Sequence, residues 1–306
     1  MNRVLWAIGA SLLACSCDTA ALQLRLAGPR QANPGKFVDI LADQAFVDRG
    51  GQRLDFDLYR PADFAKGGRP IVILVHGGFW SLGQRSDMAE WAYDLAAHGY
   101  LAATIGYRLV GNGVTFPLPV GDVLAAIRFF HEHAIDYGGD SNRIAVFGLS
   151  AGANLAMLAG LTSDASVFDP DLSQGQTIPV AAIVDLFGRA DLTVYTENSP
   201  PEEVFVIEQY LGTRIDQAGD LLRTASPVNY VRSDGPPVLI IHGDADTLIP
   251  VTQSRRLHDA LNAASQPNEY LEVSGMDHLP GAIWQGQFAQ GYRPKVLEFL
   301  SERLGN

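Results

Sequence analysis

Cysteine and basic residues are scarce in this chain of 306 residues. The only two cysteines, Cys15 and Cys17, precede any plausible folded body, which excludes a disulfide framework and a cysteine-based zinc site. Lysine and arginine total 22 against 34 aspartates and glutamates, which gives a formal net charge of −12. Because an acidic surface without a basic run repels phosphate backbones, we expect no nucleic-acid partner. The sequence also lacks repeats and low-complexity segments, so neither a solenoid nor a disordered chain is expected.

Long apolar runs are absent as well, and the amino terminus carries only a short one. Arg3 is followed by an apolar run at 4–13 and then by small residues up to Cys17, which is the plan of a secretory signal in residues 1–17. The run is about half as long as a membrane-spanning helix, so we expect no permanent transmembrane anchor.

The residues before the first cysteine resemble a bacterial lipobox, with Leu-Leu-Ala-Cys at 12–15. Cleavage before Cys15 and its lipidation would attach the protein to a membrane. We therefore expect export, as a periplasmic protein or membrane-anchored lipoprotein in a bacterium and as a secreted protein otherwise. The alternatives are an ordinary cleaved signal peptide and a buried apolar N-terminal helix.

The rest of the chain is expected to form one domain. Residues 18–36 have a mixed composition and indicate an N-terminal arm. Residues 37–306 suffice for one sizeable core, because single α/β domains of about 250 residues are common. Within them, 190–222 is too polar for a strand and carries one predicted helix at 201–211, so we expect a small lid insertion over the site.

From residue 71 onward, short apolar runs alternate with amphipathic segments. The runs predict strands buried on both faces, and the segments between them predict helices. The predicted strands are 71–75, 101–107, 144–148, 180–186 and 238–242, the helices are 88–98, 120–133 and 151–162, and an antiparallel hairpin of 37–45 and 52–59 precedes them. This order indicates an α/β fold with a mostly parallel central sheet and helices on both faces. Ligands bind beyond the carboxyl ends of the strands in such sheets.

The strand at 144–148 runs into a G-x-S-x-G sequence, and a predicted helix follows at once. The sequence is Gly148-Leu149-Ser150-Ala151-Gly152. Between a strand and a helix this pattern is typical of a nucleophile elbow, a turn so tight that only small residues fit two places on either side of the serine. Ser150 is therefore the predicted nucleophile, near the N-terminus of the next helix, where developing negative charge is favoured.

A serine hydroxyl needs a base, and a carboxylate must orient that base. Of the seven histidines, His278 follows the strand-like residues 270–273, where the chain order of serine, acid and histidine puts the base. Its alternative is a loop histidine without a role. Asp244 and Asp246 compete as the acid: Asp246 is better placed to reach His278, and Asp244 is the structural alternative that braces the loop. His242, at the end of the preceding strand, is interpreted as a packed structural histidine.

Serine chemistry also needs backbone amides for the oxyanion. The stretch 76–80 directly follows the strand 71–75, and its Gly77 and Gly78 let the backbone turn its amides toward the serine. Ala151 offers the amide after the nucleophile. The alternative is a glycine turn beside a packed aromatic pair, Phe79 and Trp80.

Together these motifs resemble the α/β-hydrolase esterases, specifically the group near hormone-sensitive lipase, bacterial feruloyl-esterase-like proteins and kynurenine formamidase. The match runs from about residue 52 to the C-terminus and includes H-G-G-x-W at 76–80, the elbow, the stretch 187–192 and H-G-x-x-D at 242–246. The resemblance implies a single α/β-hydrolase domain, and its implied site residues are the triad Ser150, Asp246 and His278 and the oxyanion donors Gly78, Phe79 and Ala151.

Two residues depart from the family pattern. Phe79 stands where the usual H-G-G-G motif has its third glycine, as in the H-G-G-x-W subgroup. Asp277 stands where relatives often have glycine before the histidine, and it would either raise the basicity of His278 or point to solvent.

The sequence thus predicts an exported serine esterase that forms an acyl-enzyme on Ser150 from a small-molecule ester, with no metal or organic cofactor. The predicted substrate-binding residues are Trp80, Phe187, Leu248 and Leu279, each of which is alternatively part of the core. A formamidase or small-peptide or amide hydrolase with the same triad is the second interpretation. A non-catalytic, surface-tethered binding protein on a hydrolase fold is the third. The acid excess would give anionic substrates an unfavourable field on approach.

Overall fold

The structure is a computed structural model that describes residues 31–33, 36–62, 68–282 and 286–305. The predicted signal at 1–17, Cys15 within it, and most of the predicted arm at 18–36 lie outside the described residues. None of the helices in the described part of the chain is long and apolar enough to span a membrane.

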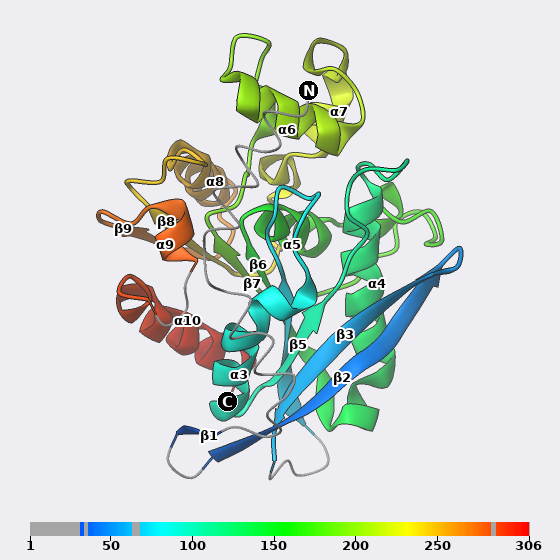
Figure 1. The fold of residues 1–306 in the computed structure, drawn as a ribbon, viewed down its shortest axis with the longest axis vertical. Helices are drawn as coiled ribbons and strands as arrows, with labels where there is room; N and C mark the ends of the chain where they lie inside the picture. Colours follow the sequence, from blue (N-terminus) through cyan, green and yellow to red (C-terminus); the bar gives the residue numbers. More distant parts are fainter. Residues whose placement is uncertain (1–30, 34–35, 63–67, 283–285, 306) are drawn as a thin grey trace.

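A nine-stranded sheet forms the centre of the domain (Figure 1). In spatial order the strands are β1 (Gln31–Asn33), β2 (Lys36–Arg49), β3 (Gln52–Pro61), β5 (Leu101–Ile105), β4 (Arg69–Val75), β6 (Gly139–Leu149), β7 (Ala182–Leu186), β8 (Val238–Gly243) and β9 (Asn268–Val273). Pairing is antiparallel from β1 to β5 and parallel from β5 to β9. The prediction of an α/β fold with a mostly parallel sheet is confirmed.

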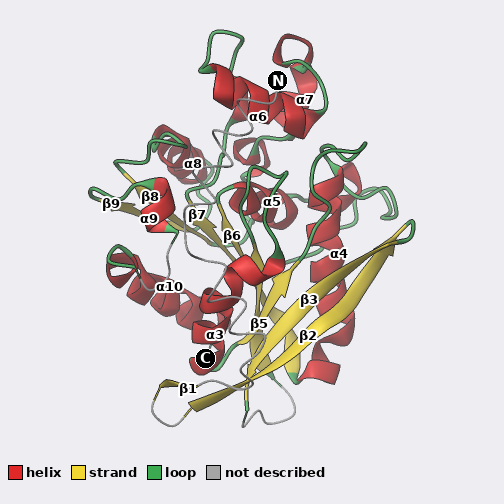
Figure 2. Cartoon of the chain, viewed as in Figure 1, coloured by secondary structure: helices red, strands yellow, loops and turns green. Residues whose placement is uncertain are grey.

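Helices cover both faces of this sheet (Figure 2). On one face lie α4 (Leu118–His133), α5 (Ala151–Leu161) and α8 (Thr252–Ala263), and on the other lie α3 (Ala89–Ala97) and α10 (Ala289–Leu304). Residues 71–75 of β4 are all apolar because both faces of the strand are covered. Ile71, Ile73 and Val75 pack toward α4 and α5, whereas Val72 and Leu74 pack toward α3. A central parallel strand has no solvated face, so its side chains do not alternate in polarity.

Two helices lie between β7 and β8, in and just after the stretch 190–222, and we call this segment the cap. Helix α6 (Pro201–Leu211) has the range that the sequence predicts, and α7 (Gly219–Thr224), which the sequence does not predict, ends two residues beyond 222. Both helices lie at the top of the view in Figure 1, beyond the parallel strands. Tyr210 of α6 stacks on Trp80, with 4.0 Å between ring centroids and 6° between planes, so the cap packs directly on the loop after β4.

Besides α7, the hairpin and the C-terminal helix depart most from the prediction. The hairpin of β2 and β3 is longer than 37–45 and 52–59, and Arg49 near its tip binds Asp169 at 2.7 Å. The helix α10 was not predicted at all, because Gly291 and Pro294 both disfavour a helix. Burial of one face decides the outcome there, through Tyr292, Val296, Phe299 and Leu300.

Candidate active site

Ser150 occupies a strained turn between β6 and α5. Its backbone has a φ of 56°, in the left-handed region that non-glycine residues rarely adopt. The two motif glycines permit the turn: a Cβ on Gly148 would lie 2.3 Å from the carbonyl oxygen of Gly152, and one on Gly152 would lie 2.3 Å from that of Val75. The G-x-S-x-G pattern is therefore a steric requirement of this close approach.

Side chains from three loops converge at Ser150. His278 Nε2 lies 2.9 Å from Ser150 Oγ, and His278 Nδ1 lies 2.6 Å from Asp246 Oδ2. Because the carboxylate can only accept, Nδ1 carries the proton and Nε2 is free to accept the serine hydroxyl. Ser150 follows β6, Asp246 follows β8 and His278 follows β9, so the three meet at the carboxyl edge of the parallel sheet.

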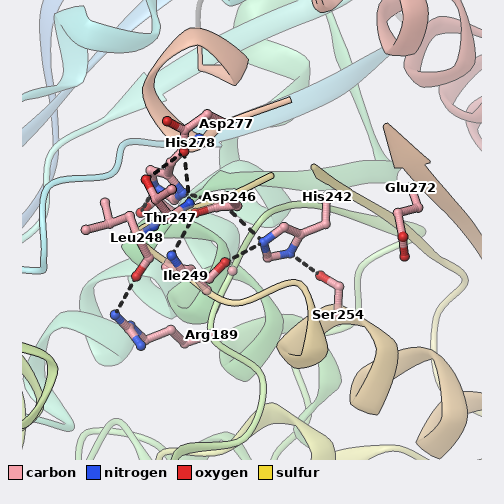
Figure 3. Close-up of polar contacts among 12 residues, drawn as sticks. Arg189, His242, Asp246, Thr247, Leu248, Ile249, Ser254, Glu272, Asp277 and His278 are labelled. Atoms are coloured by element: carbon pink, nitrogen blue, oxygen red, sulfur yellow. Dashed lines mark hydrogen bonds and ion pairs between the residues drawn. The ribbon is translucent and has the colours of Figure 1, made fainter. Parts of the chain in front are cut away.

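Asp246 is held as an anion by four hydrogen-bond donors. Its Oδ1 accepts the backbone N–H groups of Leu248 at 2.9 Å and Ile249 at 2.7 Å, and its Oδ2 accepts from His278 and from His242 (Figure 3). Burial alone would raise the pKa of Asp246, but the hydrogen bonds from His242, His278 and Ile249 outweigh it and hold the pKa well below its usual range.

Asp244 and Asp277 have other tasks. Asp244 Oδ1 accepts the N–H of Gly275 at 2.6 Å, so Asp244 braces the loop before His278. This is the structural role that the sequence analysis gave as the alternative for Asp244. Asp277 Oδ1 accepts the backbone N–H of His278 at 2.8 Å and that of Thr247 at 2.9 Å. Asp277 therefore caps α9 (His278–Gly281) and joins two loops, which is neither of the two roles considered for it.

His76 fixes the loop that follows β4. Its Nδ1–H donates to the carbonyl oxygen of Gly77 at 2.7 Å, and its ring stacks on Tyr107 with 4.3 Å between centroids. Burial lowers the pKa of His76 to about 4, so the ring is neutral near pH 7. Because C=O and N–H point in opposite directions across a trans peptide, anchoring the Gly77 carbonyl also orients the N–H of Gly78.

The three amides predicted for the oxyanion have no acceptor of their own. Among the residues that the structure describes, the N–H groups of Gly78, Phe79 and Ala151 donate to none. The loop runs beside the nucleophile, since a Cβ on Gly77 would lie 3.2 Å from Ser150 Cβ. These amides are thus available to an anionic oxygen next to Ser150.

A small pocket adjoins Ser150. It is lined by Phe79, Trp80, Ser150, Ala151, Arg189 and Ile249. Trp80 is placed in its wall as the sequence analysis expects, and Phe79 of the oxyanion loop lies there too.

The other three predicted substrate-binding residues, Phe187, Leu248 and Leu279, do not line this pocket. Phe187 is fully buried, and its ring packs against that of His278 with 4.4 Å between centroids. Ile249, next to Leu248, lies in the pocket wall, and Leu279 is 42% exposed. The role of these three residues in substrate binding stays a prediction.

Arg189 and Ile249 are pocket residues that the sequence did not reveal, and Arg189 is the charged one. It is 3% exposed and pairs with Glu203 of α6 at 2.9 Å, and it also bonds the hydroxyl of Tyr195. Its Nη2 donates to the carbonyl oxygen of Leu248 at 3.4 Å. Arg189 stands inside the family-like stretch 187–192, which was the available signal, but nothing in the sequence pairs it with the cap.

The described ranges contain no group of three or more histidine, cysteine, aspartate or glutamate side chains arranged to hold a metal ion.

The parallel sheet, the strand–turn–helix at Ser150 and the histidine and aspartate that meet it define an α/β-hydrolase. More narrowly, the chain belongs to the BD-FAE family, whose model matches residues 56–261. This family assignment agrees with the esterase resemblance found in the sequence.

Named relatives point the same way. The chain is 36% identical to Esterase LipC of Mycobacterium tuberculosis over 72% of its own length and 56% of that protein, and 33% identical to Esterase LipQ of the same organism over 75% and 55%. It therefore spans about half the length of these relatives.

Solved structures agree in fold: a truncated carbohydrate esterase from gut microbiota has a TM-score of 0.74 at 25% identity, covering 87% of this chain and 96% of that one. A propionate-bound esterase of Thermogutta terrifontis has a TM-score of 0.72 at 23% identity, covering 85% and 93%.

Proposed function

We propose that this chain hydrolyses carboxylic esters of small molecules through an acyl-enzyme on Ser150. The observation that carries the proposal is the continuous hydrogen-bonded series from Ser150 Oγ through both nitrogens of His278 to Asp246. Membership of the BD-FAE family and the esterase names of LipC and LipQ support ester hydrolysis over other acyl transfers.

The reaction proceeds in two halves. His278 Nε2 takes the proton of Ser150 as Oγ attacks the ester carbonyl, and Asp246 stabilises the imidazolium that forms. The amides of Gly78, Phe79 and Ala151 receive the oxyanion. His278 then protonates the leaving alcohol, activates water, and the acyl group leaves Ser150 as a carboxylic acid.

The pocket limits the group that it can take. Phe79, Trp80, Arg189 and Ile249 form a small pocket beside Ser150, which favours short acyl groups over long chains. The stack of Trp80 on Tyr210 and the pair of Arg189 with Glu203 hold α6 down, so the proposed preference is for acetyl to butyryl esters.

Replacing the nucleophile tests the function. Ser150→Ala is expected to lower the turnover of p-nitrophenyl acetate by several orders of magnitude, to the residual of about 10³–10⁴ over water that oxyanion stabilisation and binding supply. Wild type is expected to be labelled by a fluorophosphonate and Ser150→Ala is not. Equal hydrolysis by the two proteins would refute the proposal.

The same assay separates the other interpretations. Faster cleavage of a formyl-amide or peptide than of an ester at equal concentration would identify an amide hydrolase with the same triad. A folded wild type with neither turnover nor labelling would identify a non-catalytic protein.

We also propose that the protein is exported and lipidated at Cys15, on the strength of the apolar run at 4–13 and the lipobox-like residues 12–15. In a bacterial host fed an alkyne-tagged fatty acid, wild type is expected to carry the tag and to sediment with membranes, and Cys15→Ser is expected to lose both properties. A tag that persists in Cys15→Ser, or an untagged wild type, contradicts lipidation.

A further inference from the structure

His242 contacts the same carboxylate as His278. It is fully buried at the end of β8, and its Nε2 lies 3.2 Å from Asp246 Oδ2 and 2.9 Å from the carbonyl oxygen of Ile249. Asp246 Oδ2 also accepts the Nδ1–H of His278 at 2.6 Å. Figure 3 shows the two imidazoles on either side of Asp246. One carboxylate oxygen therefore serves two histidines.

Ser254 determines which nitrogen of His242 carries the proton. Nε2 faces two acceptors, the Ile249 carbonyl and Asp246, so it is the donor. Nδ1 lies 2.7 Å from the Oγ of Ser254, a fully buried residue of α8, and accepts the hydroxyl proton. The ring is thereby held in the tautomer that points an N–H at the proposed triad acid.

We propose that His242 is a positioning residue that sets the basicity of His278 by sharing Asp246 with it, an inference that rests on the proposed function. The Nε2–H of His242 draws negative charge away from the oxygen that pairs with His278. The positive end of the same N–H dipole also lies close to the imidazolium that His278 becomes. Both effects disfavour protonated His278, so His278 remains a base to lower pH than it would without His242.

Two titratable groups besides Asp246 face His242 from the neighbouring strands. Glu272 of β9 is its register partner, and hydrogen bonds from Arg255 of α8 and from Tyr270 lower the pKa of Glu272 to about 2, so its charge is constant in the working range. Asp185 of β7 lies on the same face of the sheet as His242, and burial raises its pKa to about 6. Asp185 is the group whose titration must be separated from that of His278.

The test compares two replacements of His242. His242→Leu removes the donor and keeps an apolar side chain of similar reach, whereas His242→Gln retains an N–H near the position of Nε2. Two readouts are measured: the acidic limb of kcat/KM against pH with p-nitrophenyl acetate, and the pKa of the His278 imidazole by NMR titration of carbon-13-labelled histidine. His131→Gln, a change in the last turn of α4 at a residue that does not line the pocket, controls for the loss of a histidine.

His242→Leu is expected to move both readouts upward by roughly half a pH unit, and His242→Gln to bring them back toward wild type. Ser254→Ala removes the hydroxyl that fixes the tautomer of His242, so it is expected to shift both readouts in the same direction by a smaller amount. This variant replaces His242→Leu in the test if His242→Leu does not fold. An unchanged pKa of His278 in these variants, or an acidic limb that disappears in Asp185→Asn, overturns the proposal. If wild type neither hydrolyses esters nor reacts with a fluorophosphonate, the proposed function fails, while the NMR titration still decides the role of His242.

Discussion

At the scale of single residues, Asp244 and Asp246 lie two positions apart in the sequence and have different roles. Asp246 bonds His278, and Asp244 bonds the backbone of Gly275. An aspartate can serve either purpose, so the sequence alone left both open. The backbone after β8 decides between them, because the N–H groups of Leu248 and Ile249 turn Asp246 inward.

Exchanging each carboxylate for its amide separates these roles. Asp246→Asn removes the charge that stabilises the imidazolium and disturbs the tautomer of His278, so kcat for an ester is expected to fall about 10⁴-fold. Asp244→Asn keeps an oxygen that can accept from Gly275, so it is expected to lose far less. Steady-state kinetics on both variants are the measurement. A larger loss in Asp244→Asn would assign the acid to Asp244.

Asp185 offers a pH-dependent test of stability. It is fully buried, its Oδ1 accepts the N–H of Gly188 at 2.8 Å, and Oδ2 has no hydrogen-bond partner among the described residues. Burial raises its pKa from 3.8 to about 6. A raised carboxyl pKa means that the folded state favours the protonated form. The stability that the neutral Asp185 carboxyl contributes is complete below the pKa of this group in the unfolded chain, and it is lost as pH rises through about 6.

Asp185→Asn removes this charge and keeps the acceptor for Gly188. Its free energy of unfolding relative to wild type is therefore expected to grow between pH 4 and pH 7, by up to about 3 kcal/mol. Urea unfolding at pH 4, 5.5 and 7 measures the difference. A difference that is the same at all three values would mean that Asp185 does not titrate in the folded state.

At the scale of elements, α6 is joined to the pocket by an ion pair. Arg189 and Glu203 have side chains that are 3% and 15% exposed, and they link the residues after β7 to the cap. A buried pair is costly to break from one side, because one charge is left uncompensated.

Replacing one or both partners measures this link. Glu203→Leu leaves the buried charge of Arg189 uncompensated and is expected to lower the free energy of unfolding by about 3 kcal/mol. The double variant Arg189→Met with Glu203→Leu is expected to recover most of that loss. Urea unfolding of the wild type, both single variants and the double variant gives the coupling energy. Additive effects would show that the two side chains do not depend on one another.

Elements were predictable where the sequence pattern is local. The elbow at Ser150 was found because strand, tight turn and helix follow within a few residues, and α6 was found because Pro201 starts an amphipathic run that ends before Gly212. The helix α10 was missed because Gly291 and Pro294 oppose it locally and its stabilising contacts lie on other strands. Arg189 was missed, and the contact of His242 with Asp246 was not foreseen, because the partners Glu203 and Asp246 are reached only through the tertiary fold.

At the scale of the whole molecule, the net charge of −12 acts on substrates before they bind. An anionic ester approaches against this field, and salt screens it as the Debye length falls from about 30 Å at 0.01 M to about 8 Å at 0.15 M. We expect kcat/KM for p-nitrophenyl hemisuccinate to rise several-fold over this range and that for p-nitrophenyl acetate to stay constant. A decrease for the anionic ester would show that Arg189, in the pocket wall, outweighs the global field.

The hydrogen bond between Ser150 and His278 joins positions 128 residues apart. Ser150 directly follows β6, near the middle of the sheet, and His278 begins α9, beyond β9 at the far edge of the sheet. Contacts of such wide separation form late, because a long loop must close before they contribute. Recovery of the proposed ester hydrolysis after dilution from urea therefore reports the last stage of folding. We expect it to be slower than the return of helical and strand signals in circular dichroism.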